Sequence, residues 1–187
     1  GWIITQHRFR AGGQRLLASG AGFVACYADL DAFKPFNDVY GYRRGDDLIQ
    51  LLGEILVETS DPREDFVGHI GGDDFLVLFQ SQDWQARCER ALALFEHRVS
   101  PLLAEEDIAR GGIITENRLG QRVQHGLPSL SLGAVPVEFG QFFSHHEISA
   151  AAAEAKKQAK RVAGNSLFVE RRKHQAAATP GQSFTSL

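Results

Sequence analysis

The chain has 187 residues, of which 43% are hydrophobic and 23% charged, and its formal net charge is −3. This length fits one domain with a core of its own, and the composition is ordinary for a globular protein. The charge balance argues against a nucleic acid polymer as a partner. No apolar run approaches the roughly 18 residues that a membrane-spanning helix needs.

The two ends of the chain differ in character from its middle. Residues 1–15 are mixed and leave the N-terminal edge uncertain, whereas the polar residues 171–187 predict a disordered tail. Because the chain begins with Gly and contains no Met, we expect the first segment to be a linker from a longer protein and residues 16–170 to be the folded domain. No signal peptide is visible. Cys26 and Cys88 form no disulfide framework, which predicts buried free thiols and a cytoplasmic location.

The first half of the chain predicts a strand, helices and a hairpin. A near-continuous apolar run over residues 23–30 is typical of a central strand that is buried on both faces. Pro35 suits the first turn of a helix, and Gly45 interrupts the pattern before a clear helical stripe over residues 48–56. Two apolar runs within residues 66–79 flank a glycine-rich turn and predict a β-hairpin.

The second half predicts two more helices and further strands. Apolar residues repeat at helical spacing over residues 84–99, and residues 111–125 alternate like a peripheral hairpin. Residues 130–137 predict another strand. Ser144 fits the N-cap of a capping box that opens an alanine-rich helix, and residues 166–170 predict a short final strand.

The order of these elements predicts the fold. A β-α-β-β-α-β core is followed by an extra helix and strand, and the peripheral hairpin precedes the fourth core strand. This order indicates an α+β fold of the ferredoxin-like split type, in which helices flank a central antiparallel sheet. No internal repeat or coiled-coil pattern is visible.

The predicted hairpin carries two aspartates at its turn. Gly71 and Gly72 precede Asp73 and Asp74, and adjacent like charges repel each other unless a cation lies close to both. A second pair of carboxylates, Asp29 and Asp31, stands at the end of the first predicted strand. Two strand ends that carry carboxylates predict a Mg²⁺ site, because this ion takes oxygen ligands and shares them with substrate phosphates. The alternative is a solvated turn, since Gly and Asp both suit turns.

Two motifs together point to a family. Residues 29–48 read DLDAFKPFNDVYGYRRGDDL, and residues 71–75 read GGDDF. At this spacing they resemble the GGDEF domain, the diguanylate cyclase module of bacterial cyclic di-GMP signalling. The likeness covers residues 16–170 and is greatest to the GGDEF domain at the C-terminus of composite proteins that also carry an EAL domain. It implies the palm-like fold that these domains share with nucleotidyl cyclases.

The resemblance also implies an activity and partners. Such a domain makes cyclic di-GMP from two GTP molecules with Mg²⁺ or Mn²⁺, and a second GGDEF subunit completes the catalytic site. We further expect other domains of a longer parent protein. The implied metal ligands are Asp29, the backbone carbonyl of Leu30, Asp73 and Asp74, and the last two are also the implied catalytic residues. Asp31 would face the same side as Asp29 in a continued strand, but we expect it to cap the following helix.

The resemblance assigns further residues to GTP. Backbone amides at a helix N-terminus attract phosphate oxygens, and Lys34 adds a point charge. Asn37 and Asp46 match the family's guanine readers, since a carboxylate can accept hydrogen bonds from the N1–H and amino groups of guanine. As an alternative, Lys34 is an ordinary surface lysine, and Asn37 and Asp46 are turn or cap residues. The implied GTP-binding set is Ala32, Phe33, Lys34, Asn37, Asp46, Gly71, Gly72 and Lys160.

Lys160 matches a phosphate-binding lysine of the family near the end of the predicted last helix. Lys156, Lys157 and Arg161 lie close to it in the sequence. We interpret these neighbours as cations that favour a helix C-terminus, most clearly for Lys156 and Lys157.

Several positions depart from the family pattern. Asp74 replaces the usual Glu and reaches about 1.5 Å less. Gly164 stands where a phosphate-binding Arg is usual, and Tyr42 stands where His is usual. Pro62 replaces the Arg of a product-binding motif that ends at Asp65, so we expect no product-inhibition site.

Two functions follow, and a third is weaker. The first is a diguanylate cyclase that works as a dimer. The alternative is a catalytically weak or inactive GTP-binding module that controls a linked domain such as an EAL phosphodiesterase, which the replacements at Asp74 and Gly164 favour. The third is a bare ferredoxin-like interaction domain.

Overall fold

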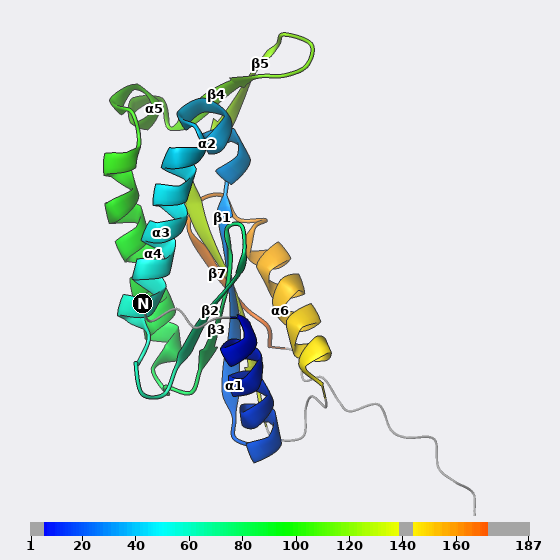
Figure 1. Cartoon of the computed structure of the whole chain (residues 1–187). Coiled ribbons are helices and arrows are strands. Elements are labelled where there is room, and N and C mark those ends of the chain that lie inside the picture. The colour runs from blue at the N-terminus through cyan, green and yellow to red at the C-terminus, as the bar shows by residue number, and fades with distance from the viewer. Residues whose placement is uncertain (1–5, 139–143, 172–187) are drawn as a thin grey trace, which may run out of the picture.

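The computed structural model describes residues 6–138 and 144–171 and shows a five-stranded sheet between two layers of helices (Figure 1). No helix in these two ranges is long and apolar enough to cross a membrane. The elements are α1 (Gln6–Ser19), β1 (Phe23–Asp31), α2 (Phe33–Tyr40), α3 (Tyr42–Thr59), β2 (Phe66–Gly71), β3 (Asp74–Phe79), α4 (Trp84–Val99), the 3₁₀ turn η1 (Ser100–Leu102), α5 (Glu105–Arg110), β4 (Gly112–Glu116), β5 (Arg122–Gly126), β6 (Ser129–Val137), α6 (His145–Ala159) and β7 (Ser166–Val169).

The central sheet has the strand order β2-β3-β1-β6-β7. β1 lies in the middle and pairs antiparallel with both β3 and β6, while β7 pairs parallel with β6 at the edge. All of β1 except Tyr27 and Asp31 is buried, as the continuous apolar run predicts for a strand covered on both faces. The predicted α+β fold, with helices flanking an antiparallel sheet and a separate hairpin of β4 and β5, is confirmed.

Each face of the sheet is covered by two helices. α3 and α4 pack on one face through a cluster that includes Leu52 and Phe95, and α1 and α6 contribute to a second cluster that includes Leu16 and Ala152. Helix α6 approaches β6 very closely at Gly133, where an added Cβ atom would lie 2.2 Å from the backbone nitrogen of Lys156. Only a glycine permits this contact, which fixes the height of α6 over the sheet.

Some boundaries differ from the prediction. Helix α1 occupies much of the segment whose placement the sequence left uncertain, and α3 continues through Gly45. Helix α6 ends at Ala159, although its alanine-rich pattern continues to Ala163. Ser144 is its N-cap, as predicted, and accepts a hydrogen bond from the backbone of Glu147 at 3.3 Å. The domain limits stay a prediction, and the predicted tail beyond residue 171 lies outside the described residues.

Candidate active site

Three aspartates meet at one end of the sheet because of strand register. β1 pairs with β3 so that Ala28 lies opposite Phe75, which places Asp29 and Asp74 at the same level, one residue further along. Asp73 lies in the turn between β2 and β3. One carboxylate oxygen from each of Asp29, Asp73 and Asp74 lies within 4.8 Å of the other two. We call these three residues the acid cluster. Three hard oxygen donors at this spacing fit Mg²⁺ or Mn²⁺.

The turn that carries Asp73 needs its glycine. Gly72 has a φ of 57°, in the left-handed region that glycine adopts without strain. His69 braces the turn: its Nε2 lies 2.8 Å from the carbonyl oxygen of Gly72, and its ring stacks on Phe75 at 4.5 Å. The predicted hairpin is therefore present, with its two aspartates beside Asp29.

Two lysines at the C-terminal end of α6 reach the acid cluster: one lies in its last turn and the other is its C-cap. The Nζ atom of Lys160 lies 3.0 Å from Asp29 and 2.9 Å from Asp31, and it donates to the Leu30 carbonyl at 3.1 Å. Lys156 lies one helical turn earlier, 3.4 Å from Asp29 and 3.3 Å from Asp74. Lys156 does lie in the last turn of α6, as expected of a helix C-terminal cation, but the sequence interpretation missed its contacts with the acid cluster. Its spacing of four residues from Lys160, which places both on one helix face, is the signal that could have revealed them.

Asp31 does not cap α2, contrary to our expectation. The N-cap is Ala32, which has a φ of 57° and makes no side-chain capping bond. The Asp31 carboxylate instead accepts hydrogen bonds from the hydroxyls of Ser129 at 2.7 Å and Ser131 at 2.8 Å. Its ion pair with Lys160 adds to this, so Asp31 holds the lysine beside the cluster.

The charges of the cluster perturb one another. Burial, a hydrogen bond with Asp29 and the charge of Asp29 raise the pKa of Asp73 from its ordinary 3.8 to about 7. Burial alone would raise the pKa of Asp29, but the hydrogen bond with Asp73 and the charge of Lys160 lower it overall. Burial and the charge of Asp74 raise the pKa of Tyr27 to about 12. Near neutral pH, Asp73 therefore exchanges a proton readily while Asp29 stays ionised.

The predicted guanine readers lie around the junction of α2 and α3. The Oδ1 atom of Asn37 is buried and has no hydrogen-bond partner among the described residues. A Cβ atom added to Gly45 would lie 1.8 Å from this oxygen, so the glycine makes room for the amide. Asp46 follows directly and is exposed. A buried amide oxygen without a partner, next to an exposed carboxylate, suits a ligand that brings hydrogen-bond donors.

Other predicted residues stay outside the acid cluster. The Lys34 side chain is 85% exposed and pairs with Asp38 at 2.8 Å. Gly164 is exposed and has a φ of 83°. Asp65 accepts hydrogen bonds from the backbone of Asp61 at 2.7 Å and of Gln80 at 2.9 Å, so its carboxylate ties together the ends of the hairpin.

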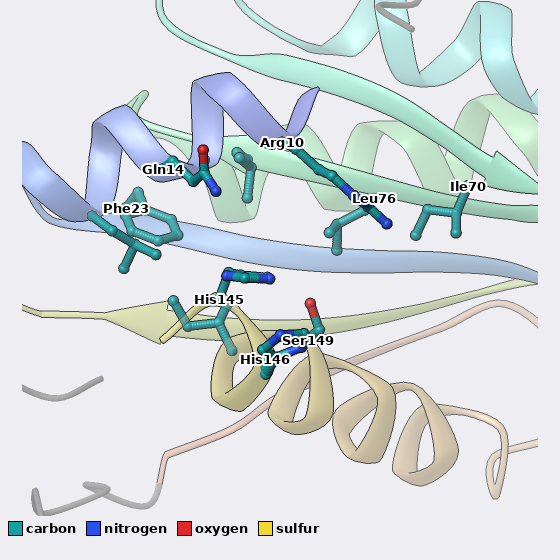
Figure 2. Close-up of a pocket in the computed structure, with 12 residues that line it drawn as sticks. Arg10, Gln14, Phe23, Ile70, Leu76, His145, His146 and Ser149 are labelled. Carbon is teal, nitrogen blue, oxygen red and sulfur yellow. The ribbon is translucent and has the colours of Figure 1, made fainter. Parts of the chain in front are cut away.

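A separate cavity of about 240 Å³ lies between α1 and α6 (Figure 2). Apolar side chains that include Phe23 and Leu76 line it. Arg10 and Gln14 enter from α1, and His145 enters from the start of α6. No member of the acid cluster lines this cavity. The candidate active site is therefore the acid cluster, which lies apart from the cavity.

Curated relatives share parts of this sequence. Diguanylate cyclase DgcS of Shewanella oneidensis is 39% identical over 67 residues, which are 35% of this chain and 22% of that protein. The bifunctional diguanylate cyclase/cyclic di-GMP phosphodiesterase MucR of Pseudomonas aeruginosa is 27% identical over 81 residues, or 43% of this chain and 12% of that protein. The match thus spans less than a quarter of either relative.

Solved structures share the fold. The GGDEF domain of TpbB (YfiN) from Pseudomonas aeruginosa has a TM-score of 0.61 at 21% identity, covering 89% of this chain and 90% of that one. The coiled coil and GGDEF domain of DgcB from Caulobacter crescentus, solved with c-di-GMP, has a TM-score of 0.64 at 22% identity, covering 90% and 82%. The sequence profile described as "Diguanylate cyclase, GGDEF domain" matches residues 3–110, more than half of this chain. The chain therefore belongs to the GGDEF domain family of diguanylate cyclases.

Proposed function

We propose that this domain is a diguanylate cyclase that joins two GTP molecules into cyclic di-GMP. The observation that carries the proposal is the acid cluster, in which oxygens of Asp29, Asp73 and Asp74 converge within 4.8 Å beside two lysines. Carboxylates next to cations suit a reaction that binds triphosphates and moves a proton. Membership of the family supports a role in cyclic di-GMP signalling, and we extend it here to the substrate GTP.

The chemistry requires a base and a clamp for phosphate. The 3′-oxygen of one GTP forms a bond to the α-phosphorus of the other, the bond to pyrophosphate breaks, and the hydroxyl proton must leave. Asp73 suits the role of base, because its carboxylate lies in the acid cluster and a positioned carboxylate can accept a proton. Lys160 would hold phosphate oxygens. Mg²⁺ or Mn²⁺, when bound by the acid cluster and the carbonyl of Leu30, would neutralise phosphate charge.

Asn37 and Asp46 would recognise the guanine ring of GTP. Their amide and carboxylate groups match the edge of guanine and mismatch that of adenine. Ala32, Phe33, Lys34, Gly71 and Gly72 complete the proposed nucleotide contacts. Because cyclic di-GMP contains two equivalent phosphodiester bonds, a second copy of the domain would supply the other nucleotide. We further propose a cytoplasmic location, where GTP is made, and attachment to other domains in a longer protein.

The alternative is a GTP-binding regulatory module, and a specific observation favours it. The position that would carry a phosphate-binding Arg is Gly164, which has a φ of 83°, so the backbone there is in a conformation that disfavours Arg. Together with the shorter side chain of Asp74, this would weaken the hold on the triphosphate. Binding of GTP at this site would then control the activity of a linked phosphodiesterase domain.

One experiment separates the two functions. The domain is incubated at high concentration with GTP and Mg²⁺, and the nucleotides are separated by chromatography, with Asp73→Ala as the control. Cyclic di-GMP formed by the parent and not by the variant supports the cyclase. Unchanged GTP that remains bound to the parent supports the module, and the absence of both product and bound GTP contradicts both proposals.

A further inference from the structure

Lys156 lies in an unusual place for a lysine. Its Nζ atom bridges Asp29 at 3.4 Å and Asp74 at 3.3 Å, and it also lies 4.2 Å from the centre of the Tyr27 ring. The side chain is only 18% exposed. Two carboxylates and an aromatic face together form a binding site for a cation, and here the cation is part of the chain.

The backbone keeps Lys156 close to the cluster. The contact with Gly133 fixes the height of α6 at this residue, so the ammonium group can leave only by rotation of its own flexible stem. Lys160 differs, because its ammonium group is also held by Asp31 and by the carbonyl of Leu30. Of the two lysines, Lys156 alone pairs with Asp74 among the described ion pairs.

The ammonium group and a divalent cation would need the same oxygens. Asp29 and Asp74 are two of the three members of the acid cluster, and each ion pair with Lys156 reduces the negative charge that attracts a metal. We propose that Lys156 is an internal counter-cation that competes with the divalent metal for Asp29 and Asp74 until the phosphates of a bound nucleotide take over its ammonium group. This inference rests on the proposed function, because it assumes that a triphosphate binds beside the cluster.

The competition predicts coupling between two ligands. Metal alone would bind weakly, since it must displace the lysine without compensation. A triphosphate would accept the ammonium group and release the two carboxylates. By linkage, the metal would then strengthen nucleotide binding by the same factor. Lys156 therefore couples the binding of the metal to the binding of the nucleotide.

The test measures Mn²⁺ binding by electron paramagnetic resonance of the free ion, with and without a GTP analogue that cannot be cleaved between its α- and β-phosphates. Lys156→Met is compared with the parent and with Lys157→Met, which removes an exposed lysine that pairs with Glu154 at 3.9 Å. Without analogue, we expect Lys156→Met to bind Mn²⁺ at least about tenfold tighter, within the usual range of coupling between sites. Lys157→Met should match the parent.

The analogue tests the second half of the inference. Because it binds Mn²⁺ itself, the relevant quantity is the ratio by which it strengthens Mn²⁺ binding in each protein. We expect that ratio to fall at least about fivefold in Lys156→Met and to stay unchanged in Lys157→Met. Equal Mn²⁺ affinities of the two variants without analogue would overturn the competition. An unchanged ratio would overturn the transfer of the ammonium group to phosphate.

Two controls keep the result interpretable. Thermal unfolding shows whether the variants fold, and Lys156→Gln replaces Lys156→Met if the latter does not. A parent that makes no cyclic di-GMP and binds no analogue would defeat the proposed function. The comparison with Mn²⁺ alone would still decide whether Lys156 competes for the acid cluster.

Discussion

Asp73 is the residue whose protonation should most visibly affect stability. Its pKa is about 7 in the folded protein, against an ordinary 3.8. The folded state therefore holds a proton that the unfolded state releases as the pH rises from about 4 to 7, and stability falls over that range. Because the group is partly exposed and solvent screens its charge, the loss should be on the order of 1 kcal/mol.

We accordingly expect Asp73→Asn to stabilise the domain at pH 8 and to change little at pH 4.5, in urea unfolding without divalent metal. Asp47→Asn, at an exposed position of α3, serves as control and should have the same small effect at both values. An Asp73→Asn variant that is destabilised equally at both pH values would contradict the proposed proton sharing with Asp29.

Gly45 offers a second residue-scale prediction. Ala at this position would favour the helix by up to about 1 kcal/mol, but its Cβ atom would lie 1.8 Å from Oδ1 of Asn37. The amide must therefore move away. We expect Gly45→Ala to bind GTP at least about tenfold more weakly in calorimetry, a loss of about 1.4 kcal/mol, with ATP binding nearly unchanged. Parallel losses for both nucleotides would indicate general damage.

The acid cluster could be predicted from sequence, whereas its cations could be predicted only in part. Asp29 lies at the end of an apolar run and Asp73 in the turn of a hairpin, and both elements are recognisable from their own strand patterns, although their meeting depends on the pairing of β1 with β3. Lys156 reaches the cluster because Gly133 lets α6 descend onto β6, and the apolar pattern of neither element reveals such a close approach of helix and strand. Asp31 was misread for a similar reason, since its partners Ser129 and Ser131 lie on β6.

At the level of elements, the connection between α6 and β7 would limit which residues can hold phosphate under the proposed function. Gly164 has a φ of 83° with nothing within 4 Å of its added Cβ atom, so its constraint is backbone conformation and not space. Gly164→Arg should lower the free energy of unfolding by about 1 kcal/mol. The matched control is Ala163→Arg, at an exposed neighbour without a positive φ, which should cost less in the same urea titration.

The same pair of variants also tests the role of this connection in binding. If Gly164 is what weakens the hold on phosphate, Gly164→Arg should tighten GTP binding despite its lower stability, because Arg can grip phosphate through two parallel hydrogen bonds. Ala163→Arg should not do so. Equal gains in the two variants would indicate a general effect of added positive charge.

The sequence predicts an element well where its apolar residues form one clear pattern, either a continuous run or a helical stripe. The continuous apolar run of β1 and the helical stripe of α3 each identify their element directly. The start of α3 was harder, because Gly45 disfavours a helix and is retained within it beside Asn37. Helix α1 contains Gly12 and Gly13 in the segment that the sequence left unassigned, and its position depends on packing against the sheet.

At the scale of the whole molecule, the candidate site lies at the end of the sheet where β1 ends beside the turn between β2 and β3. Each chain provides one acid cluster and one candidate pair of guanine readers. A product with two equivalent phosphodiester bonds therefore calls for two chains that face each other. Under the proposed function, the rate would be a property of the dimer and not of the single chain.

The dimer requirement predicts how an inactive subunit behaves. Asp73→Ala retains the rest of the surface, so it should pair with the parent and lower cyclic di-GMP formation. In tenfold excess it should draw nearly all parent chains into mixed dimers, and the rate should fall severalfold at saturating GTP. An equal mass of serum albumin should have no effect. Dilution of the parent alone should also lower the rate per chain, since fewer chains are paired. A rate per chain that neither dilution nor the inactive subunit changes would mean that one chain completes the reaction, and the facing arrangement would then be wrong.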